Sequence, residues 1–302
     1  MFTLAHLSDP HLAPLPPPRW RELAGKRVLG YVNWQRNRHA IHRADVLAEI
    51  LRDMKSRAPD HIAVTGDLVN ISLTREFEHA LKWLETLGSP SDVTVVPGNH
   101  DAYVRIAAHE HERHWAPYMS GDVHEGLYRF PFVRRRGPVA LIGVTTAVPT
   151  APFMATGQLG RGQIERLADT LGKFQFEPDS PFRVVMIHHL PVSAAARHKR
   201  LTDSAAFLRV IAQCGAELVI HGHDHAHALE WLDAPDGGKI PAIGVPSASA
   251  APGMDHDNAG YNLYRIEGDP RQWRCVVETR GLLADGKVHA RRQLEFRSPV
   301  RR

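Results

Sequence analysis

Five short apolar runs of this sequence each lead into a cluster of His, Asp or Asn, and these clusters contain the residues best suited to do chemistry. In open α/β sheets, ligands bind beyond the carboxyl ends of the strands. If the runs are strands, the polar clusters should therefore converge on one site. The clusters are Ser8-Asp9-Pro10-His11, Gly66-Asp67, Gly98-Asn99-His100-Asp101, His188-His189 and His221-Gly222-His223-Asp224-His225.

The residue types in these clusters predict a metal centre. Imidazoles mixed with carboxylates, without a thiolate, suit first-row ions such as Mn, Fe or Zn. Seven candidate ligands are too many for one tetrahedral ion with an open position, so they predict two ions. Asp67, which stands alone after a glycine, is the candidate for the carboxylate that bridges them. The seven are Asp9, His11, Asp67, Asn99, His188, His223 and His225.

The order of these motifs resembles that of the calcineurin-like metallophosphoesterase superfamily, and within it the class III cyclic nucleotide phosphodiesterase and glycerophosphodiesterase branch. The pattern is Asp-x-His, Gly-Asp, Gly-Asn-His-Asp, His and Gly-His-x-His, and it spans about three quarters of the chain. The resemblance implies that one ion is held by Asp9, His11 and His225. It implies that the other is held by Asn99, His188 and His223, with Asp67 between the two.

The resemblance also implies a reaction, the hydrolysis of a phosphate ester, with a diester as the expected substrate, by a water that the two ions activate. His100 would contact the scissile phosphate. Oriented by Asp101, it would serve the leaving oxygen as a general acid or as an electrostatic partner.

The substrate stays open at this point. A cyclic nucleotide, a glycerophosphodiester, a lipid-linked phosphate or pyrophosphate at a membrane surface, and a nucleic-acid end would all present the same centre to the metals. Nucleic acid is the weaker of these alternatives, because the chain has only a modest basic segment. A non-catalytic metal-binding scaffold is a further alternative, although such a protein would not need the full ligand set.

Other histidines among the 20 in the chain fit structural roles. His109, His111 and His114 predict a solvated helix or loop face rather than a metal tract. We expect His6 in the core. His189 and His221 are expected to support ligands or the fold.

The elements that must position the site follow from periodicity. Helical spacing of apolar residues predicts helices over residues 46–54, 77–87, 164–171 and 206–211. After His225 the pattern changes to consecutive strands, over residues 227–232, 240–245, 261–266, 273–278 and 288–296. This predicts a second, largely antiparallel sheet. The resemblance implies an α/β fold in which two sheets pack together with helices outside, a four-layer αββα sandwich.

Composition agrees with a single domain over residues 1–302. The chain is 43% hydrophobic, which suffices for a large core. Its two cysteines predict no disulfide framework. It has no apolar stretch near the length of a spanning helix, and we expect a cytoplasmic protein, peripheral at most to the inner face of a membrane. The oligomeric state cannot be predicted.

A basic and aromatic insert over residues 13–43 separates the first two motifs. Residues 19–43 contain seven Lys or Arg and one Glu, a net charge of +6. Three interpretations compete: an ordinary connection, a cap that binds substrate, and an element that binds an anionic membrane surface. For the cap, the candidate substrate-binding residues are Trp34, Arg36 and Arg38.

Overall fold

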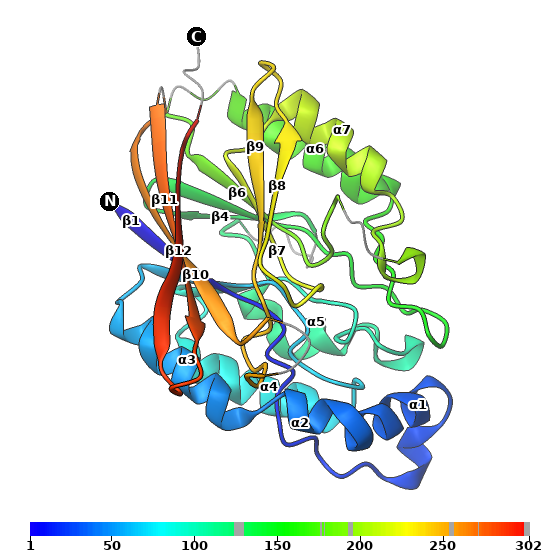
Figure 1. Cartoon of the computed structure of the whole chain (residues 1–302). Helices are drawn as coiled ribbons and strands as arrows, with labels where there is room; N and C mark the ends of the chain where they lie inside the picture. Colours follow the sequence, from blue (N-terminus) through cyan, green and yellow to red (C-terminus); the bar gives the residue numbers. More distant parts are fainter. Residues whose placement is uncertain are drawn as a thin grey trace.

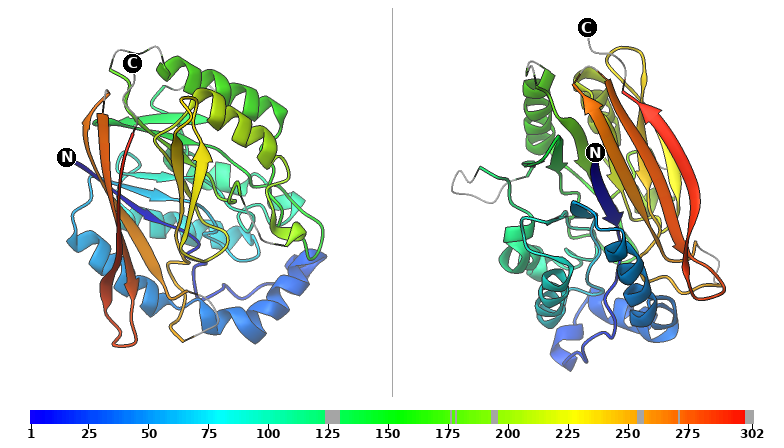
Figure 2. Two further views of the ribbon diagram at one scale, coloured as in Figure 1. Left: turned by 45° about the horizontal axis from the view of Figure 1, so that its top comes forward. Right: turned by 90° about the vertical axis from the view of Figure 1, so that its left-hand side faces the viewer.

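The computed structural model describes residues 1–123, 130–175, 177, 179–192, 196–253, 257–270 and 272–298. Its centre is a pair of six-stranded sheets with helices on their outer faces, as Figures 1 and 2 show. The αββα sandwich predicted from the sequence is thereby confirmed.

The first sheet has the order β12-β11-β10-β1-β2-β3, and the second has the order β4-β5-β6-β7-β9-β8. The strands of the first sheet are β1 (Phe2–Leu7), β2 (His61–Val64), β3 (Val93–Val95), β10 (Gly260–Asp269), β11 (Gln272–Leu282) and β12 (Val288–Arg297). Those of the second are β4 (Phe132–Arg136), β5 (Val139–Gly143), β6 (Phe182–Met186), β7 (Leu218–His221), β8 (Ala228–Asp233) and β9 (Lys239–Gly244).

Two apolar clusters hold the layers together. In the larger one, side chains of both sheets meet, among them Leu4 of the first and Val184 of the second, and helices α3 (Ala44–Ser56) and α4 (Thr74–Leu87) contribute to it as well. The smaller cluster lies beneath α6 (Arg161–Gln175) and α7 (Ser204–Cys214), which cover the outer face of the second sheet. All four helices contain the positions at which the sequence predicts helical periodicity.

The prediction that the C-terminal strands form a second sheet is wrong in one respect. The five strands exist, but they do not form a sheet of their own. β9 adds in parallel to β7, and β10 adds antiparallel to β1. An open strand edge leaves N–H and C=O groups unpaired, and the two edges offered by β7 and β1 are filled by this late part of the chain. Both sheets are therefore mixed.

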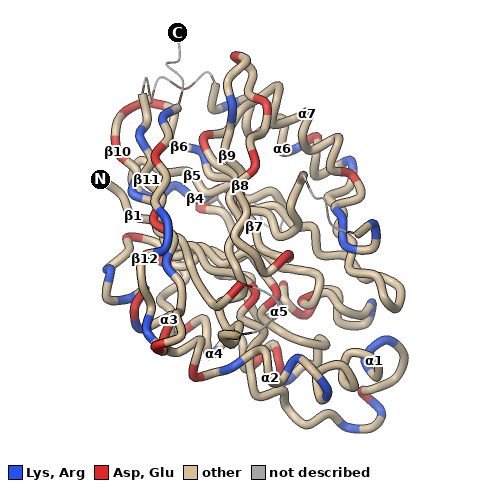
Figure 3. Tube along the Cα trace, in the orientation of Figure 1, with Lys and Arg blue, Asp and Glu red and all other residues tan. Residues whose placement is uncertain are grey.

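The insert is helical and lies beside the carboxyl ends of the strands. It consists of η1 (Trp20–Leu23), α1 (Lys26–Asn33), the π-helical turn η2 (Trp34–Arg38) and α2 (His39–Ile41). Figure 3 shows the Lys and Arg residues along α1 and its flanks. The remaining short helices are η3 (Arg105–Ala107), α5 (Glu110–Trp115), η4 (Ala116–Tyr118) and η5 (Arg197–Lys199).

Within the described residues, no helix combines the length and the apolar character needed to span a membrane.

Candidate metal centre

The polar clusters meet where parallel strands of both sheets end. β1, β2 and β3 run parallel in the first sheet, and β5, β6, β7 and β9 run parallel in the second. Four clusters begin within three residues after one of these strands, and the fifth begins at His221, the last residue of β7. Parallel strands place their carboxyl ends on the same edge, so the convergence predicted from sequence is found.

The backbone turns sharply at five of the seven candidate ligands. Their φ angles lie in the left-handed region, which is uncommon for residues other than glycine and is frequent at functional sites. The surrounding structure must hold these turns, because each costs free energy. The five residues are Asp9 (φ 51°), His11 (37°), Asp67 (55°), His223 (72°) and His225 (53°).

Main-chain hydrogen bonds join the turns to one another. The N–H of Asp9 donates to the carbonyl of Gly66 at 3.0 Å, and the N–H of His11 donates to the carbonyl of Asp67 at 3.1 Å. The loop after β1 is thus fixed to the loop after β2. This fixes two candidate ligands of one ion relative to the carboxylate expected to bridge.

Asp101 has a different role from the one predicted. Its carboxylate accepts hydrogen bonds from the main-chain N–H groups of Asp67 (2.8 Å), Leu68 (2.9 Å), Val69 (3.1 Å) and Gly98 (2.8 Å). The prediction that it orients His100 is wrong for this geometry, because the His100 ring is held by the carbonyl of Asn70 instead. Asp101 is a positioning residue for the loops that carry Asp67 and Asn99.

The first group of candidate ligands is tightly clustered. Ligand atoms of Asp9, His11 and Asp67 all lie within 4.8 Å of one another. His225 Nε2 lies 3.1 Å from Asp9 Oδ1 and 3.3 Å from His11 Nε2. Four side chains from three strand ends therefore enclose one position that a cation could occupy.

The second group is assembled around Asp67 as well. His188 Nε2 lies 3.4 Å from Asp67 Oδ2 and 3.3 Å from Asn99 Oδ1. The His223 ring lies near the His188 ring, with centroids 5.2 Å apart, and its Nε2 donates to the carbonyl of Lys199. Asp67 contacts both groups, since His11 Nε2 is 3.8 Å from its Oδ2.

The electrostatics of the site fit metal binding. Burial opposes the charge of Asp9, but His225, His188 and Ser8 together outweigh burial and lower the pKa of the Asp9 carboxyl. Burial lowers the pKa of His223 to about 3, with a contribution from His188. Burial also lowers the pKa of His11. Ionised carboxylates and neutral imidazoles are the forms that bind metal.

The pKa of His188 shifts in the opposite direction from those of the other two histidines. Burial opposes its charge, yet Asp67, with Asp9 and the carbonyl of Thr65, outweighs burial and raises the pKa of His188 to about 10. The carboxylate thus attracts positive charge strongly. A divalent cation between the two groups would supply that charge and release the proton of the imidazole.

Two glycines, because they lack a Cβ atom, leave room for the ligand side chains. A Cβ atom on Gly98 would lie 2.3 Å from Asp67 Oδ1 and 2.7 Å from His188 Cε1. A Cβ atom on Gly222 would lie 2.4 Å from Asp9 Oδ2. The glycines that precede the ligands are therefore required by close approach, and the donor set as built fits first-row metal ions.

His100 lies at the edge of this centre with Arg38 beside it. The His100 ring lies 4.9 Å, centroid to centroid, from that of His11. Its Nδ1 donates to the carbonyl of Asn70, and Arg38 Nη1 donates to its Nε2 at 3.0 Å. Burial, followed by the Arg38 guanidinium, lowers the pKa of His100 to about 3. The positive charge at this position therefore belongs to Arg38.

The three insert residues proposed to bind substrate differ in their placement. Arg38 is half-buried at the site, whereas Arg36 is exposed to solvent. Trp34 is buried, and its ring is parallel to that of His42 with centroids 6.4 Å apart. Of the three, only Arg38 contacts a side chain at the edge of the centre, that of His100.

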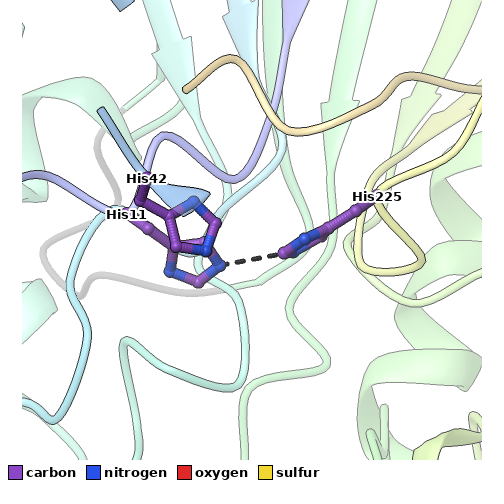
Figure 4. Close-up of side chains that lie close together, drawn as sticks. All are labelled: His11, His42 and His225. Atoms are coloured by element: carbon purple, nitrogen blue, oxygen red, sulfur yellow. Dashed lines mark hydrogen bonds between the residues drawn. The ribbon is translucent and has the colours of Figure 1, made fainter. Parts of the chain in front are cut away.

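The sequence did not single out His42, which also lies at the centre. Its ring is 4.4 Å from that of His11 and 5.7 Å from that of His225, centroid to centroid. Figure 4 shows the three imidazoles together. His42 follows a short helix and no strand, so the rule about strand ends could not identify it.

For the histidines expected outside the centre, the predicted structural roles are confirmed in part. His6, His189 and His221 are buried, and His189 supports His223 from the side, with ring centroids 4.2 Å apart. The prediction of a solvated face holds for His109. It is wrong for His111, which is 3% exposed because α5 packs this side chain inward.

We expect the purified protein to bind two transition-metal ions per chain, and Asp67→Ala to lose binding at both positions because Asp67 contacts both ligand groups. Metal analysis by mass spectrometry, together with calorimetric titration, measures this. His109→Ala is the matched control, as an exposed histidine that should leave the metal content unchanged. A single ion in the wild type, or full metal content in Asp67→Ala, would contradict the assignment.

Comparisons with known proteins place this geometry in a family. A model of calcineurin-like phosphoesterases matches residues 2–227. A probable cyclic nucleotide phosphodiesterase of Synechococcus is 26% identical over 237 residues, which cover 76% of this chain and 80% of that protein.

Solved structures share the fold. A dimetal phosphatase from Danio rerio has a TM-score of 0.59 at 15% identity, covering 96% of this chain and 98% of that chain. GAP50, the anchor in the inner membrane complex of Plasmodium, has a TM-score of 0.53 at 12% identity, covering 100% of this chain and 89% of that chain. Because the family match spans most of its length, this chain belongs to the calcineurin-like phosphoesterase family.

Proposed function

We propose that this chain is a dinuclear metal-dependent phosphodiesterase. The observation that carries the proposal is the arrangement of two ligand groups that share Asp67, with His100 and Arg38 at one edge. Asp9, His11 and His225 would hold one ion, and Asn99, His188 and His223 would hold the other. The similarity to a probable cyclic nucleotide phosphodiesterase supports a diester as the substrate.

When bound, the two ions would supply Lewis acidity toward the phosphate oxygens and a water of lowered pKa as the nucleophile. The chain itself would orient the substrate. Arg38 presents a guanidinium, which can bind two phosphate oxygens at once. His100 accepts a hydrogen bond from Arg38 and thereby sets the direction of that guanidinium.

The insert also contacts Tyr103, whose ring stacks on that of His100. The Tyr103 ring is nearly parallel to that of His100, at 5.3 Å between centroids. The Lys26 ammonium of α1 lies 4.4 Å from the centre of the Tyr103 ring. Of the three interpretations of the insert, these contacts favour the substrate cap.

A lipid-linked substrate is a second candidate, favoured by the exposed apolar side chains on the insert. Trp20 is 78% exposed, and Val28, Leu29 and Val32 are also exposed. Arg21 lies beside them, and its guanidinium is 4.9 Å from the Trp20 ring centre. Apolar side chains among basic ones are typical of elements that contact a lipid surface.

Turnover measurements test the proposed reaction. With Mn²⁺, Fe²⁺ or Zn²⁺ supplied, we expect bis(p-nitrophenyl) phosphate to be hydrolysed with a higher kcat/KM than p-nitrophenyl phosphate, and a chelator to abolish both. A panel of a cyclic nucleotide, a glycerophosphodiester and a lipid-linked phosphate in vesicles then separates the candidates. Preference for the monoester, or turnover unaffected by chelation, would argue against a metal-dependent phosphodiesterase.

The role of His100 can be separated from metal binding. We expect His100→Ala to keep both ions and to lower kcat by roughly 10²-fold, as for the loss of one preorganised electrostatic contact. Because its Nε2 accepts from Arg38, the loss should be similar for alkyl and nitrophenyl leaving groups. A loss confined to the alkyl diester would assign His100 the role of general acid instead.

Arg38 and Arg36 form a matched pair in the same turn of the insert. We expect Arg38→Ala to raise KM for the diester at least tenfold, since it removes a guanidinium beside the phosphate position. Arg36→Ala removes an equal charge from an exposed position and should leave KM unchanged. If the two variants behave alike, the insert acts through its overall charge, and Arg38 has no specific role.

A further inference from the structure

His42 is buried at the centre although it belongs to the insert. It is 2% exposed, and ring nitrogens of His11, His42 and His225 all lie within 4.8 Å of one another. Ligand nitrogens of one ion, bound at about 2.1 Å, can be separated by about 4.2 Å at most. Small movements of the side chains would therefore bring all three onto one ion (Figure 4).

The orientation of His42 matches that of the expected ligands. Its Nδ1 is hydrogen-bonded to Ser249 Oγ at 3.0 Å, which leaves Nε2 for the centre. In the same way, Nδ1 of His11 is bonded to the carbonyl of Val69 and Nδ1 of His188 to that of Thr65. An imidazole that binds a metal usually has its second nitrogen fixed by such a partner.

Main-chain hydrogen bonds of the residues before and after His42 fix its segment to residues 249–251. The N–H of Arg43 donates to the carbonyl of Ser249 at 3.0 Å, and the N–H of Ala251 donates to the carbonyl of Ile41 at 2.7 Å. Trp34 covers one face of the His42 ring. The imidazole is therefore preorganised toward the centre rather than free to turn away.

We propose that His42, through Nε2, is an additional ligand of the ion held by Asp9, His11 and His225. The inference rests on the proposed metal centre and adds to it a residue from outside the strand-end motifs. Three imidazoles would bind the ion at this position and two would bind the ion at the other. The two positions would therefore differ in the metal ion they prefer. Imidazole-rich sites suit ions such as Zn and Fe, whereas oxygen-rich sites suit Mn.

Two variants separate ligation from folding. In His42→Asn the amide replaces the nitrogen that faces Ser249 and leaves nothing toward the centre, whereas in His42→Gln an amide reaches the position of Nε2. We expect His42→Asn to lower the affinity for one of two ions by at least tenfold, and His42→Gln to lower it less. His39→Ala, an exposed histidine on α2, should change neither affinity.

Two readouts besides activity complete the experiment. In protein with ¹⁵N-labelled histidine, the Nε2 resonance of His42 should shift on loading with Zn²⁺, and the metal-free melting temperature of His42→Asn should equal that of the wild type. Two ions bound by His42→Asn with wild-type affinity, or an unshifted His42 resonance, would overturn the proposal. Failure of the wild type itself to bind two ions would instead overturn the metal centre.

Discussion

The buried carboxylate of Asp101 is the constraint on which the rest of the centre depends. It accepts four main-chain N–H groups from the loops after β2 and β3 and so fixes the direction in which Asp67 and Asn99 leave the first sheet. Without this acceptor, the buried N–H groups would be unsatisfied, at a cost of about 1–3 kcal/mol each. The left-handed turn at Asp67 is stable because this carboxylate holds it.

The carboxylates at the strand ends of the first sheet also contact residues of the second sheet. Asp67 lies against His188, and Asp9 lies against His225, so carboxylates of the first sheet face imidazoles of the second. The two sheets are thus joined at the site by carboxylate–imidazole contacts as well as by the apolar core between them. A centre built from both sheets requires that their carboxyl edges stay aligned, and the large shared core provides that alignment.

The sequence predicts most of this arrangement because its signals are local. A strand that ends in Gly-Asp or Gly-Asn-His-Asp carries both the element and its ligand within a few residues. The positions of His42 and His111 depend on where a helix packs, and no neighbouring residue encodes that packing. The partners of Asp101 are hidden from the sequence for the same reason, since three of its four hydrogen bonds go to a loop about 30 residues earlier. Likewise, the sheet that each C-terminal strand joins is decided by an open edge far away in the sequence.

The central claim is that two ions share Asp67 between the sheets, and anomalous diffraction from crystals grown with Mn²⁺ tests it most directly. The account predicts two anomalous peaks about 3.5–4 Å apart, with an Asp67 carboxylate oxygen between them. A single peak, or two peaks that do not flank Asp67, would contradict it.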